Sequence, residues 1–108
     1  MKRVSVIIPN WNGKDLLGPC LESLYRQEFD DFETILVDNG STDGSISFVE
    51  KNFPQVEIIR FTENRGFSAA VNVGIVASNA LYVGLLNNDT EVDAAWLKEL
   101  VAALDANP

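Results

Sequence analysis

Four clusters of polar side chains in this sequence each follow a short, mostly apolar segment. The richest cluster is Asn87-Asn88-Asp89, which ends the run 81–86. The others follow the runs 4–8, 33–37 and 56–61, and they are Asn10-Trp11-Asn12, Asp38-Asn39 and Asn64-Arg65. This pattern is typical of buried strands that reach the surface at a site. The same residue types also turn the chain and cap helices, so for each cluster taken alone both interpretations are open.

Together these side chains favour the recognition of a nucleotide. A carboxylate suits a hard cation, an arginine suits phosphate, and an aromatic ring with amides suits a base and sugar. Mg²⁺ is commonly held by one or two carboxylates plus substrate phosphates. No G-x-x-x-x-G-K-[ST] occurs, and Pro9–Gly13 stands where a G-x-G-x-x-G would follow the first strand. The predicted ligand is therefore a nucleoside diphosphate linked to a further group.

Composition removes several other classes of function. The 8 Lys and Arg against 16 Asp and Glu give a formal net charge of −8, which excludes a basic nucleic-acid footprint. An anionic ligand therefore needs a metal ion or a well-placed arginine. No histidine is present, so this chain cannot form a Ser-His-Asp triad, a Cys-His dyad or a His-ligated zinc site. Cys20 shares helical spacing with Leu17, Leu21 and Leu24, which predicts a buried core thiol.

Hydrophobic periodicity predicts alternating strands and helices. Strands are expected over the four mostly apolar segments, with the third nearer a sheet edge. Helices are expected over about 13–25, 45–52, 67–78 and from Thr90 or Asp93 to Leu104. Asn12 is the predicted N-cap of the first helix, and Ser41 or Thr42 that of the second. Asp43, Glu91 and Asp93 are interpreted as acids that cap helices or complement their dipoles, and Trp96 as a core residue. Small residues in the third helix predict close packing on the sheet.

Four βα units with short connections define an α/β fold with a mainly parallel sheet and helices on both faces. Ligands of such folds bind at the carboxyl ends of the strands, and all four polar clusters lie there. This convergence favours a functional interpretation of Asn87-Asn88-Asp89. Two roles remain open for Trp11, stacking on a base or covering the core. Arg65 is equally compatible with phosphate binding and with an ordinary surface charge.

Four blocks of this sequence resemble family 2 glycosyltransferases with the Rossmann-like GT-A fold. They lie in the family's order between Val4 and about Leu104, and they are Val4–Asn12, Ile35–Ser45, Asn64–Phe67 and Leu86–Asp89. The last two blocks look most like the branch that transfers rhamnose and related sugars in building bacterial surface polysaccharides. The expected strand order is 3-2-1-4.

The resemblance implies a role for each matching position. The residues implied to bind the nucleotide are Pro9, Asn10, Trp11, Asn12, Asp38, Asn39, Arg65, Gly66, Asn87 and Asn88. Asp89 falls on the last position of the family's D-x-D motif and is the implied ligand of Mg²⁺ or Mn²⁺ on the diphosphate. The metal would stabilise charge on the departing nucleoside diphosphate. Asn87 and Asn39 stand where the family commonly has aspartates, and no catalytic residue is assigned.

The resemblance also implies that residues 1–108 are a single domain, the donor-binding half of a longer enzyme. The expected reaction transfers a sugar, with rhamnose as one candidate, from a UDP- or dTDP-linked donor to a polysaccharide or glycolipid acceptor. The acceptor site and the catalytic base would lie in the other half. These residues are therefore expected to bind the donor without efficient transfer.

Two further expectations concern location and association. No apolar run reaches the ~20 residues of a membrane span, and no cleavage site follows Met1-Lys2-Arg3. This predicts a cytoplasmic protein, with the inner face of the membrane as an open alternative for the full-length form. In the order 3-2-1-4 the fourth strand is an apolar edge, which predicts a homo-oligomer through that edge.

A receiver-type signalling module is the alternative class. Length, acidity and βα alternation all fit it. A receiver, however, has paired acids after the first strand and a lysine after the last, where this chain has Pro9-Asn10 and no fifth strand.

Overall fold

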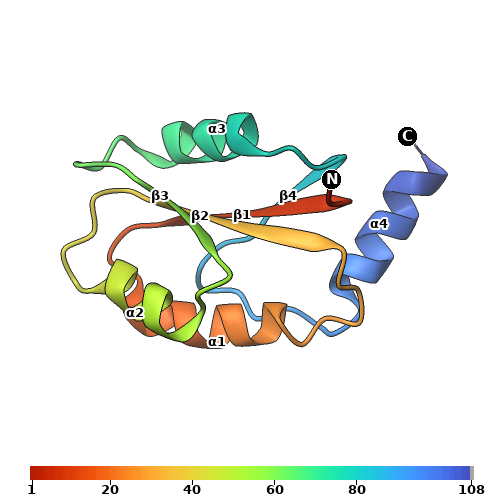
Figure 1. The fold of residues 1–108 in the computed structure, drawn as a ribbon, viewed down its shortest axis with the longest axis horizontal. Coiled ribbons are helices and arrows are strands. Elements are labelled where there is room, and N and C mark those ends of the chain that lie inside the picture. The colour runs from red at the N-terminus through yellow and green to blue at the C-terminus, as the bar shows by residue number, and fades with distance from the viewer. Residues whose placement is uncertain (108) are drawn as a thin grey trace.

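The computed structural model describes residues 1–107 and alternates strands and helices along the chain (Figure 1). The elements in order are β1 Val4–Asn10, α1 Lys14–Leu24, β2 Phe32–Asp38, α2 Ser45–Asn52, β3 Glu57–Arg60, α3 Phe67–Ala77, β4 Tyr82–Leu85 and α4 Trp96–Ala106. All eight predicted elements are present, so the predicted α/β class is confirmed.

The sheet has the order β3-β2-β1-β4, and every adjacent pair of strands is parallel. This confirms the predicted order. The register places Asn10 beside Asp38, so β1 and β2 end at the same level of the sheet. The backbone N–H of Leu86 donates to the carbonyl of Ile7 at 2.9 Å, and the chain leaves the sheet directly after this bond. The polar residues after β1, β2 and β4 therefore meet at one edge.

Helices cover both faces of the sheet, α3 on one side and α1 with α2 on the other (Figure 1). On the α1 side the buried core includes Val6, Ile8, Leu21 and Leu36. On the α3 side Gly74 lies against β1, and a Cβ at this position would come within 2.5 Å of Ile7 Cγ2. The predicted close packing of this helix is confirmed.

The starts of α1 and α2 differ from the prediction. Gly13 and Gly44 occupy the N-cap positions, and neither helix has a side-chain cap from Asn12, Ser41 or Thr42. Asp43 instead accepts the N–H of Lys14 through Oδ2 at 3.0 Å and the N–H of Ser45 through Oδ1 at 3.0 Å. One carboxylate thus serves two helix starts.

Asn12 has a different role from the predicted cap. Its backbone has a φ of 49°, in the left-handed region that asparagine tolerates better than most residues. Its Oδ1 accepts the N–H of Thr42, and its own N–H donates to Ser41 Oγ, both at 2.8 Å. The loop after β1 is therefore tied to the loop after β2, and such a tertiary pairing cannot be read from local spacing.

The last helix starts later than predicted. It begins at Trp96 rather than at Thr90 or Asp93. Asp93 forms a turn before the helix, since its Oδ1 accepts the N–H of Ala95 at 2.9 Å. Gln27 satisfies a first-turn donor, because its Oε1 accepts the N–H of Leu97 at 3.0 Å. Trp96 is half-buried against the core, as predicted.

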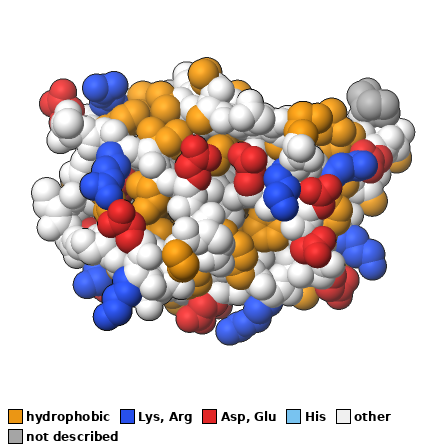
Figure 2. Space-filling model, viewed as in Figure 1, with side chains coloured by type: hydrophobic (Ala, Val, Ile, Leu, Met, Phe, Trp, Pro, Cys, Tyr) orange, Lys and Arg blue, Asp and Glu red, His pale blue; other side chains and the backbone are white. Residues whose placement is uncertain are grey.

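β4 is an edge strand within residues 1–107, as predicted, because it pairs with β1 alone. Helix α3 packs mainly on β1 and β2. Val83 and Leu85 of β4 therefore remain 40% and 46% exposed. Figure 2 shows apolar side chains along the side of the molecule where α3 lies. The large exposed apolar residues of α3, of β4 and of the position just before β4 are Phe67, Ile75, Val76, Leu81, Val83 and Leu85. None of the described helices has the length and apolar character needed to cross a membrane.

Candidate functional site

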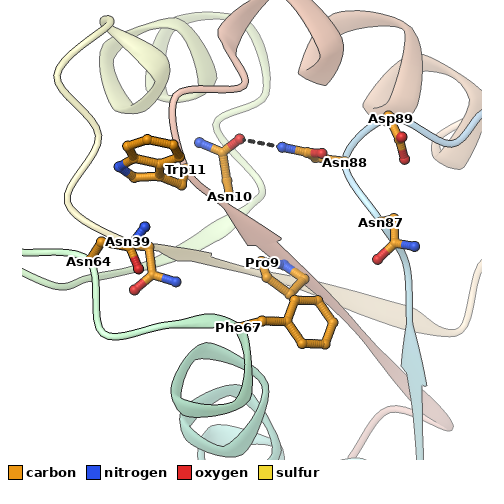
Figure 3. A pocket seen from close by; sticks show the side chains of 9 residues that line it. All are labelled: Pro9, Asn10, Trp11, Asn39, Asn64, Phe67, Asn87, Asn88 and Asp89. Carbon is orange, nitrogen blue, oxygen red and sulfur yellow. Dashed lines mark hydrogen bonds between the residues drawn. The ribbon is translucent and has the colours of Figure 1, made fainter.

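A cavity of about 370 Å³ opens at the carboxyl edge of the sheet (Figure 3). The predicted site residues that line it are Pro9, Asn10, Trp11, Asn39, Asn87, Asn88 and Asp89. Asn64 and Phe67 also line it and were not predicted as site residues, although both lie in a block that carries the family resemblance. The predicted residues outside the lining are Asn12, Asp38, Arg65 and Gly66.

Asp38 lies beneath the cavity rather than in its wall. Its side chain is fully buried and accepts hydrogen bonds from Asn10 Nδ2 at 3.0 Å, from Ser41 Oγ at 2.8 Å and from the Ser41 N–H at 2.8 Å. A buried carboxylate is stable when several donors compensate its lost hydration. This arrangement gives Asp38 a supporting position under the loops that form the cavity.

Asn10 and Asn88 connect β1 to the loop after β4. Asn88 Nδ2 donates to Asn10 Oδ1 at 2.8 Å, the contact drawn as a dashed line in Figure 3. Gly13 makes room for this contact, because a Cβ there would lie 2.3 Å from Asn88 Nδ2 and 2.5 Å from Asn10 Oδ1. Sequence reasoning did not single out Gly13, since its requirement comes from two residues far away in the chain.

Asn39 holds the loop between β3 and α3. Its Nδ2 donates to the carbonyl of Gly66 at 3.0 Å, and its Oδ1 accepts the N–H of Arg65 at 2.9 Å. An ionised aspartate could accept the second bond but could not donate the first. The asparagine that departs from the family's usual aspartate therefore matches its surroundings in this chain.

Arg65 turns its guanidinium toward Phe61, 4.8 Å from the centre of the ring. This cation–π contact positions the charge over an aromatic face. Phe67, at the start of α3, lines the cavity and remains 55% exposed. Trp11 lines it as well and is 56% exposed, which leaves its ring accessible to a ligand.

Asp89 is the only carboxylate in the cavity wall among the described residues. It is exposed, and Thr90 Oγ1 donates to its Oδ1 at a long 3.4 Å. The described residues contain no group of three or more His, Cys, Asp or Glu side chains arranged for a metal ion. One carboxylate with neighbouring amide oxygens fits a hard cation that also takes oxygens from a bound diphosphate.

Cys20 lies below the loop that carries Asp89. Burial raises the pKa of its thiol to about 11, and the negative charges of Asp89 and Glu91 add to this effect. The thiol is therefore protonated near neutral pH, and its Sγ donates to the carbonyl of Asn87 at 3.7 Å. The prediction of a buried core thiol is confirmed.

A parallel sheet of this order, with a polar cavity at its carboxyl edge, is the architecture of GT-A glycosyltransferases. The profile of "Glycosyl transferase family 2" matches residues 5–108. The chain belongs to this family, which decides against the receiver-type alternative.

Curated relatives and solved structures agree with this family. EpsJ of Bacillus subtilis, an uncharacterized glycosyltransferase, is 34% identical over 107 residues, which are 96% of this chain and 31% of that protein. The mannosyltransferase PcManGT from Pyrobaculum calidifontis, in complex with GDP-Man and Mn²⁺, has a TM-score of 0.90 at 29% identity over 99% of this chain and 33% of its own. Residues 1–349 of TarS of S. aureus, in complex with UDP-GlcNAc, have a TM-score of 0.88 at 28% identity over 96% of this chain and 31% of that one. The chain thus spans about a third of the length of these relatives.

Proposed function

We propose that this domain binds the nucleoside diphosphate of a nucleotide-sugar donor for glycosyl transfer. The observation that carries the proposal is the cavity at the carboxyl edge, where the exposed ring of Trp11 and the exposed carboxylate of Asp89 line one space. The ring suits a base, and the carboxylate suits a cation on the phosphates. Because the matched region is about a third of the relatives' length, transfer itself is proposed for the whole protein.

The charge of the site favours a cation beside the bound diphosphate. The net charge of −8 and the carboxylate of Asp89 would repel a diphosphate. Asp89 would hold Mg²⁺ or Mn²⁺, with amide oxygens of Asn87 and Asn88 nearby. When bound, the cation neutralises charge on the departing nucleoside diphosphate. Arg65 is assigned to the phosphates, which requires its guanidinium to leave the ring of Phe61.

The remaining predicted residues shape the space for the base and ribose. Pro9, Asn10 and Asn39 line the cavity, while Asn12, Asp38 and Gly66 hold the loops around it. Asn64 and Phe67 extend the wall opposite Asn87 in Figure 3. We therefore assign direct contacts to Pro9, Asn39, Asn64 and Phe67. Indirect roles are assigned to Asn12, Asp38 and Gly66, and to Asn10, which is only 2% exposed.

We propose a UDP- or dTDP-linked donor, with rhamnose as a candidate sugar, and a saccharide or lipid-linked acceptor. UDP and UDP-GlcNAc complexes of TarS support a uridine nucleotide, and the GDP-Man complex of PcManGT makes guanosine the competing base. A chondroitin synthase of Escherichia coli, 31% identical over 98 residues, supports a polysaccharide product. The site of action is proposed to be the cytoplasm or the inner face of the membrane.

We also propose self-association through the exposed edge of β4. The unpaired edge and the exposed side chains of Val83 and Leu85 support it. Sedimentation velocity at increasing protein concentration is expected to detect a dimer, and Val83→Lys is expected to reduce it. A monomer at every concentration would exclude this association.

Calorimetric titration tests the donor proposal. Wild-type protein is titrated with UDP, dTDP, GDP and ADP, each with and without Mn²⁺. We expect UDP or dTDP to bind best and Mn²⁺ to strengthen binding. Asp89→Asn should remove the strengthening by Mn²⁺ while it leaves the fold intact. No binding of any nucleotide by the wild type would contradict the proposal.

A further inference from the structure

A chain of three side chains crosses the sheet edge from Asp38 to the loop of Asp89. We call Asp38, Asn10 and Asn88 the amide relay. Asp38 Oδ1 accepts from Asn10 Nδ2 at 3.0 Å, and Asn10 Oδ1 accepts from Asn88 Nδ2 at 2.8 Å. Asp38 and Asn10 are 0% and 2% exposed, whereas Asn88 is half-buried and lines the cavity. The relay thus joins the buried floor of the site to its open wall.

The relay has a fixed direction. An ionised carboxylate only accepts hydrogen bonds, so Asp38 requires Asn10 to present its NH₂ group. Asn10 must then present its oxygen to Asn88, and Asn88 must donate. The Asn88 amide is thereby oriented with its nitrogen toward Asn10, as Figure 3 shows. Its oxygen faces away from Asn10 and is left for the cavity that the residue lines.

Few other hydrogen bonds hold residues 87–91, although the chain is anchored again at Val92, whose N–H donates to Ser23 Oγ at 3.0 Å, and at Ala94, whose carbonyl accepts the Glu28 N–H at 2.8 Å. The last sheet bond there is from the Leu86 N–H to the Ile7 carbonyl, and a turn is closed by the Thr90 N–H donating to Asn87 at 3.1 Å. The thiol of Cys20 adds a weak contact to the Asn87 carbonyl at 3.7 Å. The amide relay is therefore the side-chain tie between Asn88 and β1, and Gly13 leaves the space that it needs.

We propose that Asn10 is a positioning residue for cation-dependent donor binding and that it acts through Asn88, whose oxygen is a further contact for the cation. Asp38 orients Asn10, Asn10 orients Asn88, and this holds the neighbouring Asp89 and the Asn88 oxygen in place for the cation on the diphosphate. The inference rests on the proposed function of the cavity. Residues that orient metal ligands typically change metal affinity by about 10–100-fold when they are replaced.

A double-mutant cycle on the full chain tests the relay. The measured quantity is the ratio of the UDP dissociation constants without and with Mn²⁺, for wild type, Asn10→Ala, Asn88→Ala and the double variant. We expect Asn10→Ala and Asn88→Ala each to reduce this ratio about tenfold. The double variant should lose no more than the larger single effect, because each change breaks the same link. Asn52→Ala, an exposed asparagine of α2, is the matched control and should keep the wild-type ratio.

Amide NMR spectra without ligand give a second readout. Asn10→Ala should shift the backbone signals of residues 87–91, because the relay transmits the change, and Asn52→Ala should not. Three results would overturn the relay but not the proposed function. They are additive losses in the cycle, a wild-type ratio in Asn88→Ala, and unshifted backbone signals of residues 87–91 in Asn10→Ala. Absence of nucleotide binding by the wild type would overturn the proposed function and the relay's role in it together.

Discussion

Two carboxylates lie at the same edge of this sheet, and their surroundings differ completely. Asp38, at the end of β2, is buried and accepts three hydrogen bonds from Asn10 and Ser41. Asp89, beyond the end of β4, is exposed and accepts one long bond from Thr90. In the sequence both residues are acids that follow an apolar strand, and both were predicted to bind ligand.

The burial of each carboxylate and the number of its protein hydrogen bonds separate an acid that supports the site from one that can bind the ligand. A carboxylate whose oxygens are already satisfied by protein donors has little to offer a cation, while its removal leaves those donors unpaired in the interior. An exposed carboxylate with weak protein partners can bind a cation, and its removal leaves no buried donor without an acceptor. Asp38 therefore holds the site together, and Asp89 is available to the ligand.

The largest expected effect is the loss of stability in Asp38→Ala. The buried Nδ2 of Asn10 and two donors of the half-buried Ser41 lose their acceptor. An unsatisfied buried group costs about 1–3 kcal/mol, so the unfolding free energy should fall by about 3 kcal/mol. Urea denaturation measures this change. Asp89→Ala is the matched control and should lie within about 0.5 kcal/mol of wild type. Equal losses in the two variants would remove the distinction between the acids.

Gly13→Ala should have the next largest effect. The added Cβ would collide with the contact between Asn10 and Asn88, and Asn10 has no room to move because it is buried against Asp38. Asn88 must swing away, which should cost about 1–2 kcal/mol for the lost hydrogen bond and the misfit. The variant should also lose Mn²⁺-dependent nucleotide binding to the same extent as Asn88→Ala.

Gly18→Ala is the control for this substitution. A Cβ at residue 18 meets Phe48 at an ordinary 3.5 Å, and alanine suits a helix interior better than glycine. Thermal unfolding should therefore leave Gly18→Ala at or above the wild-type midpoint. A Gly13→Ala protein as stable as wild type, with normal Mn²⁺ dependence, would contradict the tight fit at Asn88.

Asp43→Ala should have the smallest effect on stability of this series, about 1 kcal/mol, the usual loss for a helix cap. Partial desolvation acts to raise the pKa of Asp43, but hydrogen bonds from Ser45 and Lys14 outweigh it and hold the pKa below its ordinary value of 3.8. A lowered folded-state pKa contributes stability above the ordinary value, and this contribution is lost as the pH falls through the folded-state value.

The difference in unfolding free energy between wild type and Asp43→Ala should therefore be constant near neutral pH and shrink in acid. Urea denaturation at a series of pH values measures this difference. A difference that grows as the pH falls would show that Asp43 stabilises the protein in its neutral form, contrary to this account.

The sequence predicted the elements and their order well because local patterns determine them. Mostly apolar segments identified β1 and β2, partial alternation placed β3 near an edge, and helical spacing placed Cys20 in the core. The predicted edge position of β4 was also correct. These features depend on residues close together in the chain, where periodicity is informative.

The details of the site depended on contacts between distant loops. Asp43 serves the start of α1 across 29 residues of sequence, and Asn88 pairs with Asn10 across 78. Local spacing instead suggested caps at Asn12 and Ser41, which the structure shows to be wrong. The need for glycine at residue 13 likewise appears only when Asn10 and Asn88 are brought together.

Paramagnetic broadening by Mn²⁺ tests the central claim, the division of roles between the two acids, most directly. Amide NMR spectra of wild type and Asp89→Asn are recorded with UDP while Mn²⁺ is added at substoichiometric levels. We expect the signals of residues 87–91 to broaden first in the wild type and this preference to disappear in Asp89→Asn. Asp105, paired with Arg3 and Tyr82, is the internal reference and should be unaffected. Broadening that is equal at Asp105 and Asp89, or unchanged by Asp89→Asn, would contradict the account.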